Sequence, residues 1–216
     1  MKLKYLLFAT YFSFVLNPLA MAESAEDLLY QGIIAAKKGN YIQAATWYEK
    51  ACNNGHSGGC VSLGLLYANG QGVEQSYAKA AKLYEQACND KFALGCFGLG
   101  ELHDKGQGVR QNYFKAAELY EQACNDGIAL SCGFLGYLYY KGNGVKQSDT
   151  QAIKLYKKSC SGGAAESCIK IGALYGSGRG AQKNKSTAKE YFGKACDLGN
   201  QDGCNLYKEL NQKGVP

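Results

Sequence analysis

The sequence contains little proline and little charge, and these shortages exclude several kinds of protein. Two prolines among 216 residues exclude a collagen-like chain despite 28 glycines, because collagen requires abundant proline and a glycine at every third position. Only 19% of the residues are charged while 46% are apolar, a balance that excludes an intrinsically disordered protein. The formal charge of +6 is only weakly positive, and the basic residues are not clustered in the sequence. We therefore expect no nucleic-acid partner.

Long apolar runs are also missing, apart from a short one at the N-terminus. Lys2 and Lys4 precede a charge-free stretch over 5–16, and Ala20-Met21-Ala22 offers the small residues that signal peptidase accepts. This stretch of 12 residues is too short to cross a hydrocarbon core of about 30 Å. The pattern predicts a signal peptide over 1–22, cleaved after Ala22. We therefore expect an exported protein, periplasmic or fully secreted, with no membrane span after signal cleavage.

The cysteines form five pairs with a fixed spacing. The two members of a pair lie eight positions apart, and each pair recurs after 36 residues. An even number of cysteines in an exported chain predicts a disulfide framework. Because one local pattern repeats five times, we expect each cysteine to bond to its near neighbour: Cys52 with Cys60, Cys88 with Cys96, Cys124 with Cys132, Cys160 with Cys168, and Cys196 with Cys204.

Other cysteine chemistry fits this spacing poorly. Zinc ribbons place their cysteines two to four residues apart, and the chain has no Cys-x-x-Cys redox pair. A catalytic cysteine needs a histidine, and the chain has two. We expect His56 on the surface inside the first disulfide loop. His103 should be a packing residue, because Tyr67, Tyr139 and Tyr175 fill its slot in the sister repeats. We therefore expect no metal site and no cofactor.

Within each period, the apolar spacing predicts a helix before the first cysteine. Its pattern is shown by Ala80, Leu83, Tyr84, Ala87 and Cys88, which share one helical face. A residue that can cap a helix N-terminus recurs upstream every 36 positions. These predicted caps are Asn40, Ser76, Asn112, Ser148 and Asn184.

Another helix is predicted after the second cysteine of each pair. It carries a glycine in its interior, as in Leu63-Gly64 and Ile171-Gly172, where glycine costs about 1 kcal/mol relative to alanine. A close backbone contact would explain that glycine. Turns such as Gly70-Gln71-Gly72 should end this helix through a left-handed backbone. They lack the strand and lysine of a phosphate-binding loop.

Together these elements predict one all-α domain over 23–216, an α-solenoid of stacked helix pairs clipped by local disulfides. Its first unit is degenerate, with Ser24 where the period predicts a cysteine and an inter-helix loop about four residues shorter. A short closing helix is expected from Asn205 to Pro216. The unit boundaries fall at about 24–59, 60–95, 96–131, 132–167 and 168–203, followed by a C-terminal cap over 204–216.

The segments Leu63 to Val73 and Lys79 to Ala87 resemble the Sel1-like repeat, a relative of the tetratricopeptide repeat. The added cysteine pairs resemble the Hcp-type branch, the Helicobacter cysteine-rich proteins. This resemblance implies a right-handed superhelix. It also implies either penicillin binding with weak β-lactamase activity or, as in other Sel1-like proteins, an adaptor role between proteins.

The residues themselves give limited support to β-lactam chemistry. The Ser-x-x-Lys motif of serine β-lactamases occurs at Ser76, Ser167 and Ser186. We expect Ser76 to cap a helix, Ser186 to lie in a first helical turn, and Ser167 to be fixed by the disulfide cysteine that follows it. No Lys-Thr-Gly follows, and a helical solenoid lacks the sheet of those enzymes. Efficient catalysis is not expected, while weak binding or slow turnover by another arrangement stays open.

A solenoid also exposes a concave groove, lined here by the first helices, whose slots can vary without disturbing the stack. Variable slots bring aromatic residues beside a cation, as interface hot spots favour. The candidate binding residues are Phe134, Tyr137, Tyr140, Lys170, Glu101 and Asp104. We expect a monomer that binds a protein, a peptide or a peptidoglycan-like ligand through this groove. The alternative is a weak β-lactam hydrolase.

Overall fold

The computed structural model describes residues 23–216, and the signal peptide predicted over 1–22 lies outside the described residues. The described part contains eleven α-helices. They are α1 (Ala25–Lys37), α2 (Tyr41–Asn53), α3 (Ser57–Asn69), α4 (Tyr77–Asn89), α5 (Ala93–Lys105), α6 (Tyr113–Asn125), α7 (Ala129–Lys141), α8 (Asp149–Ser161), α9 (Ala165–Ser177), α10 (Lys185–Asp197) and α11 (Gln201–Gln212).

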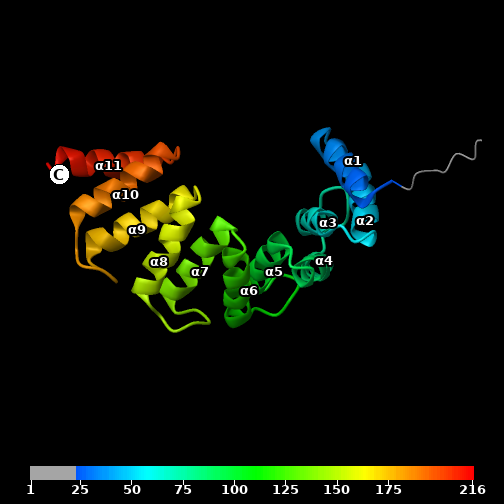
Figure 1. Ribbon diagram of the computed structural model, residues 1–216, viewed down its shortest axis with the longest axis horizontal. Helices are drawn as coiled ribbons and strands as arrows, with labels where there is room; N and C mark the ends of the chain where they lie inside the picture. The colour runs from blue at the N-terminus through cyan, green and yellow to red at the C-terminus, as the bar shows by residue number, and fades with distance from the viewer. Residues whose placement is uncertain (1–22) are drawn as a thin grey trace, which may run out of the picture.

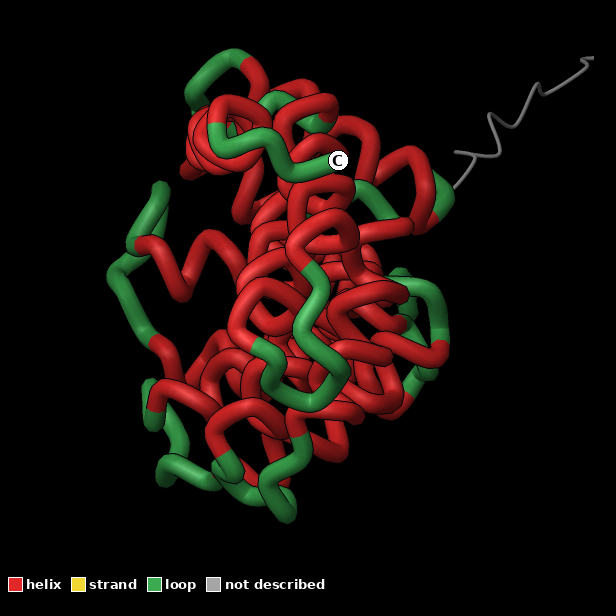
Figure 2. Tube along the Cα trace, turned by 90° about the vertical axis from the view of Figure 1, so that its left-hand side faces the viewer, coloured by secondary structure: helices red, strands yellow, loops and turns green. Residues whose placement is uncertain are grey.

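The helices stack in chain order along an arc, with α1 and α11 at its two ends (Figure 1). Each helix packs mainly against the helices that precede and follow it in the chain. Short loops join the helices throughout the part of the chain that is described (Figure 2). This nearest-neighbour packing confirms the predicted α-solenoid. None of the helices over 23–216 is long and apolar enough to cross a membrane.

The even-numbered helices up to α10 begin where the sequence predicts, because the five cap residues hold their first turns. In α4, Ser76 Oγ accepts a hydrogen bond from the Lys79 amide at 3.3 Å. In α6, Asn112 Oδ1 accepts from the Lys115 amide at 3.0 Å. The same bond forms at the starts of α2, α8 and α10.

The glycine inside each odd-numbered helix up to α9 allows close packing, as predicted, but its partner is an aromatic ring. A Cβ atom at Gly64 would lie 2.7 Å from the Tyr84 ring, and one at Gly172 would lie 2.5 Å from the Phe192 ring. Those rings are buried in the next helix. Glycine is therefore required because a buried ring occupies the space that a Cβ atom would take.

The Gly-x-Gly turns end these helices in the predicted way. Gly70, Gly106, Gly142 and Gly178 cap α3, α5, α7 and α9 with φ between 67° and 80°. A left-handed residue at this place satisfies carbonyl groups at the helix end, and glycine adopts it without a Cβ penalty. The four turns are therefore helix caps.

All five predicted disulfides are present, with Cα–Cα distances of 4.4–5.0 Å. Each links the end of an even-numbered helix to the start of the next helix. The prediction that this next helix follows the second cysteine was wrong, because α3 begins at Ser57, before Cys60. Likewise α11 begins at Gln201, earlier than the predicted Asn205. Five disulfides indicate an oxidising compartment outside the cytoplasm.

The first unit corrects one further expectation. Ser24 was predicted to stand in a cysteine slot, but it caps α1, and its Oγ accepts from the Asp27 amide at 3.0 Å. His56 has the same role at α3. Because the loop between α1 and α2 is shorter, α1 aligns with α3 after a shift of 32 residues, and Leu28 takes the cysteine position. Counting back a full period therefore misplaced Ser24.

Candidate ligand groove on helices α7, α8 and α9

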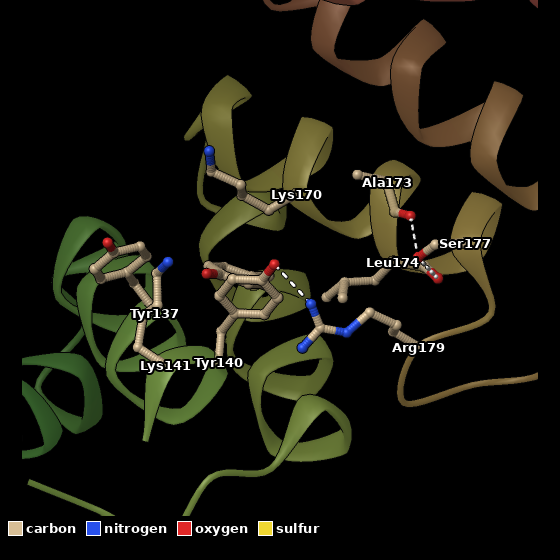
Figure 3. A pocket seen from close by; sticks show the side chains of 9 residues that line it. Tyr137, Tyr140, Lys141, Lys170, Ala173, Leu174, Ser177 and Arg179 are labelled. Atoms are coloured by element: carbon tan, nitrogen blue, oxygen red, sulfur yellow. Dashed lines mark hydrogen bonds between the residues drawn. The ribbon is translucent and has the colours of Figure 1, made fainter. Parts of the chain in front are cut away.

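Two adjoining pockets lie over α7, α8 and α9. The first, which we call the cationic pocket, has a volume of about 520 Å³ (Figure 3). Three cations, three tyrosines and no acidic residue line it. Its lining residues are Tyr137, Tyr140, Lys141, Tyr156, Lys170, Ala173, Leu174, Ser177 and Arg179.

The second, which we call the apolar pocket, has a volume of about 410 Å³. It shares Tyr137, Tyr156 and Lys170 with the cationic pocket, so the two form one continuous site. Two acidic residues also stand on it. Its remaining lining residues are Asp104, Leu130, Gly133, Phe134, Ser159, Ala164, Glu166 and Ser167.

Arg179, at the turn after α9, orders one end of the cationic pocket. Its guanidinium group donates two hydrogen bonds to Asp149, both at 3.0 Å. It donates a third to the Tyr140 hydroxyl at 2.8 Å (Figure 3). The bonds to Asp149 raise the pKa of Arg179. A bidentate arginine–carboxylate pair fixes geometry as well as charge. Tyr140 is therefore held in place by Arg179.

The three cations of this pocket differ in how their charge is balanced. Arg179 is paired with Asp149, and Lys170 Nζ lies 2.8 Å from Glu166 Oε1. Lys141 forms no ion pair within residues 23–216. Its ammonium group instead lies 5.7 Å from the ring centre of Tyr137 and 5.6 Å from that of Tyr140. The site therefore presents one uncompensated positive charge beside aromatic rings, an arrangement that suits an anion.

Tyr156 lines both pockets and is almost fully buried, with 3% of its surface exposed. Burial raises the pKa of its phenol, and the nearby Tyr140 and Tyr137 raise it further. Tyr156 therefore stays neutral at physiological pH. It contributes a rigid apolar ring to both pockets.

The floor of the apolar pocket carries two buried hydroxyl groups. Ser159 is fully buried in α8, and Ser167 of α9 is 5% exposed. Ser167 Oγ donates a hydrogen bond to Ser159 Oγ at 2.8 Å. A Cβ atom at Gly133 would lie 2.9 Å from both oxygens, so the hydroxyl pair faces the bare backbone of α7.

We call the cationic pocket and the apolar pocket together the double site. Five of the six candidate binding residues lie at it. Tyr137 and Lys170 line both pockets, Tyr140 lines the cationic pocket, and Phe134 and Asp104 line the apolar pocket. The sixth, Glu101, lines neither. It lies on α5, where its Oε1 accepts a hydrogen bond from Lys105 Nζ at 2.9 Å.

Phe134 and Asp104 also have packing roles. The Phe134 ring stacks on Tyr120 with centroids 5.3 Å apart, and Phe97 lies 5.7 Å away. Asp104 accepts a hydrogen bond from the Tyr120 hydroxyl at 3.4 Å. Burial raises the pKa of Asp104, and that hydrogen bond opposes the shift. These two residues therefore join the pocket wall to the core of the preceding repeat.

Sequence reasoning missed several residues of the site. Tyr156 looked like an ordinary core tyrosine, and Lys141 and Arg179 lie near the ends of helices, outside the variable columns. The available signal was a local departure from the repeat pattern. Gly133 stands in a slot that holds larger residues in sister repeats, and Ser159 stands where the other repeats have alanine.

In none of the three Ser-x-x-Lys motifs of the described chain does the lysine Nζ form a hydrogen bond with the serine Oγ. Ser76 caps α4, as predicted, and Ser186 lies in the first turn of α10, as predicted. Ser167 bonds to Ser159, and its motif partner Lys170 is paired with an acid. No lysine in these motifs is therefore positioned to activate its serine.

The two histidines lie apart from the double site. His56 lies inside the first disulfide loop and is half-buried, and its Nδ1 accepts a hydrogen bond from the Gly58 amide at 3.1 Å. His103 is half-buried in the predicted packing slot. Within residues 23–216 there is no group of three His, Cys, Asp or Glu side chains that could hold a metal ion.

These features define a class of protein: a helical repeat solenoid whose successive units are clipped by disulfides and whose surface carries two adjoining pockets. The chain belongs to the Sel1 repeat family. Matches to this repeat cover 18–56, 58–91, 93–128, 129–163 and 165–200.

Solved structures of the same family share the fold. A protective antigen of uropathogenic Escherichia coli with an SLR fold matches with a TM-score of 0.82 at 26% identity, over 88% of this chain and 42% of the antigen. A Sel1 repeat protein from Oxalobacter formigenes matches with a TM-score of 0.79 at 26% identity, over 87% of this chain and 78% of that protein.

Cysteine-rich relatives occur in Helicobacter pylori. A segment of 58 residues is 45% identical to HcpE, covering 27% of this chain and 16% of HcpE. A segment of 54 residues is 44% identical to the β-lactamase HcpA, covering 24% of this chain and 22% of HcpA. The match therefore spans less than a quarter of either relative, and it supports the relationship to disulfide-clipped Sel1 proteins.

Proposed function

We propose that this protein is an exported binding module whose ligand, a peptide or a peptidoglycan-like fragment, occupies the double site on α7, α8 and α9. The observation that carries the proposal is the continuity of two pockets with different chemistry. One presents an uncompensated cation between tyrosines, and the other presents an apolar recess. Ligand sites commonly combine apolar walls with a few polar groups that fix orientation.

The packing of the site supports recognition without large rearrangement. Tyr140 is held by Arg179, and Tyr156 is buried between helices. Rigid aromatic side chains lose little conformational entropy when they bind, and they are enriched among residues that dominate binding energy. A solenoid also leaves the rest of its groove free to contact a longer ligand.

The proposal is tested by fluorescence anisotropy with the oxidised chain over 23–216. The probes are labelled synthetic peptides of acidic-aromatic, basic-aromatic and alanine composition, together with soluble peptidoglycan fragments. We expect binding of an acidic probe that weakens at least tenfold in Tyr137→Ala and Lys141→Gln. The matched controls, Tyr30→Ala and Lys37→Gln, remove exposed residues of the same types from α1 and should leave affinity unchanged. Equal losses in site and control variants would contradict the proposal.

A second candidate function, weak β-lactam hydrolysis, is favoured by the position of Ser167 at the floor of the apolar pocket and by the partial match to HcpA. The pairing of Lys170 with Glu166 disfavours rapid chemistry, because that lysine does not contact the serine. Purified protein should be assayed with a chromogenic cephalosporin. Turnover that is lost in Ser167→Ala and kept in Ser186→Ala would support the enzyme. Absence of turnover above a buffer control would exclude it.

A further inference from the structure

The apolar pocket exists because one repeat lacks a side chain that its sisters have. Gly133 of α7 occupies the slot that holds Val61 in α3, Phe97 in α5 and Ile169 in α9. In those helices the side chain packs against the core of its own repeat. At Gly133 the same space is part of a pocket of about 410 Å³.

The surroundings of Phe97 show what this space can accommodate. The Phe97 ring lies 6.1 Å from the ring of Tyr120 and 5.7 Å from that of Phe134. Thirty-six residues further on, the equivalent positions are Tyr156 and Lys170, and both line the pocket at Gly133. An aromatic ring from a ligand would therefore meet Tyr156 as Phe97 meets Tyr120. Lys170 would add a cation, which is attracted to the face of an aromatic ring.

The floor of the apolar pocket has one hydroxyl group more than the equivalent place beside Phe97 in the preceding repeat. Next to Phe97 the equivalent residues are Ala123 and Ser131, whereas next to Gly133 they are Ser159 and Ser167. The two serine hydroxyls share a single hydrogen bond. Two hydroxyls carry two protons, so one proton and several acceptor lone pairs remain for a further partner. A ligand group that both donates and accepts a hydrogen bond suits this floor.

The charges around the site fix the orientation of such a ligand. The apolar pocket has Asp104 and Glu166 on its wall, so a carboxylate is disfavoured there. The cationic pocket has no acidic residue on its wall, and Lys141 has no ion-pair partner in the described chain. A ligand with a ring in the first pocket would therefore direct its negative charge into the second.

We propose that the apolar pocket at Gly133 determines specificity by accepting a tyrosine side chain of a peptide, with a neighbouring carboxylate in the cationic pocket. The ring replaces the side chain that Gly133 lacks, and the phenol hydroxyl bonds to the Ser159–Ser167 pair. This inference rests on the proposed binding function and specifies its ligand class. The carboxylate comes either from the peptide C-terminus or from an adjacent acidic side chain.

The test uses small matched probes and isothermal titration calorimetry on the oxidised chain over 23–216. N-acetyltyrosine carries the phenol and a terminal carboxylate, N-acetylphenylalanine lacks the hydroxyl, and N-acetyltyrosinamide lacks the charge. Acetyl-Tyr-Glu-amide supplies the carboxylate from a side chain. Loss of a hydrogen bond of ordinary strength should weaken the phenylalanine probe about three- to tenfold. Comparison of N-acetyltyrosine with acetyl-Tyr-Glu-amide identifies the source of the carboxylate.

Two variants isolate the pocket. Gly133→Phe combined with Ser159→Ala reproduces the composition of the sister repeat at Phe97, Ala123 and Ser131, so it should fold while filling the pocket. We expect it to weaken tyrosine binding at least tenfold, with unchanged far-UV circular dichroism and melting temperature within a few degrees. Ser159→Ala combined with Ser167→Ala removes both hydroxyls and should abolish the preference for tyrosine over phenylalanine.

The inference is overturned if the Gly133→Phe, Ser159→Ala variant folds and binds tyrosine probes as the wild type does. It is also overturned if the preference for tyrosine survives the removal of both serine hydroxyls. Failure of every small probe to bind the wild type also overturns it. The proposed function fails separately, when no acidic peptide or peptidoglycan fragment depends on Tyr137 and Lys141. A peptide whose binding depends on those two residues and not on Gly133 would support the proposed function and refute the tyrosine pocket.

Discussion

Two glycines of the same helix should respond to alanine in opposite ways. Gly172 and Gly176 both lie in α9, one turn apart. A Cβ atom at Gly172 would lie 2.5 Å from Phe192 Cε1, whereas one at Gly176 would have its nearest neighbour, the Ala188 Cβ, at 3.7 Å. Carbon atoms pack best at about 3.5–4.0 Å. Gly172→Ala therefore needs a shift of about 1 Å in a buried ring, and Gly176→Ala needs none.

The magnitudes follow from these distances. Alanine in place of an interior glycine stabilises a helix by roughly 0.5–1 kcal/mol, and both variants gain this contribution. Overpacking a buried site costs roughly 1–3 kcal/mol, and only Gly172→Ala incurs it. We expect Gly176→Ala to be more stable than the wild type by up to about 1 kcal/mol. Gly172→Ala should fall roughly 1–3 kcal/mol below Gly176→Ala, since the helix term cancels between them.

The assay is urea denaturation of the oxidised protein followed by far-UV circular dichroism. A double-mutant cycle with Phe192→Leu completes it, because a smaller side chain leaves room for the new methyl group. The loss caused by Gly172→Ala should shrink in that background by at least about 0.5 kcal/mol, within the range expected for residues in contact. Equal unfolding midpoints for the two alanine variants, or full additivity with Phe192→Leu, would refute the reasoning.

Three further changes should be visible in the same assay. Lys91 has a φ of 60° at a position where the sister repeats have glycine. Lys91→Gly should therefore stabilise the protein by roughly 0.5–1 kcal/mol, and Gly127→Lys should destabilise it. Similar unfolding midpoints for the two variants would contradict this. Replacing Cys124 and Cys132 by serine opens a loop of nine residues and should lower stability by about 2.5 kcal/mol, measured against the intact protein without reductant. Burial and the charge of Glu101 raise the pKa of Tyr84 to about 12. Tyr84 ionises near pH 10 in the unfolded chain, so stability should fall between pH 10 and 12. The fall should be smaller in Tyr84→Phe, and an equal fall in both proteins would argue against this assignment.

The groove was only partly predictable from the sequence. Variation among repeats pointed to Phe134, Tyr137, Tyr140 and Lys170, because exposed slots can change without disturbing the stack. It also pointed to Glu101, which lies away from both pockets. A column of variable residues identifies a surface. It does not show where that surface is hollow, since a pocket depends on which neighbouring side chains are small.

The sequence by itself determined the repeat and its covalent frame. A strict period of 36 residues, recurring cap residues and paired cysteines are local signals, and each acts within one or two helices. They therefore predicted the solenoid, the helix starts at the caps and all five disulfides. The predicted register of the first unit was wrong, because the shorter loop between α1 and α2 displaces α1 by four positions. Ser24 caps α1, although the period placed a missing cysteine there.

Only the tertiary structure decided which departures from the repeat matter. Gly133 on α7, Ser159 on α8 and Ser167 on α9 are separated along the chain, and none is unusual in isolation. Stacking of the three helices brings them to the floor of one pocket and places Lys141 beside it without an ion-pair partner in the described chain. The volume of a pocket is set by side chains from several helices at once, so no local pattern in the sequence encodes it.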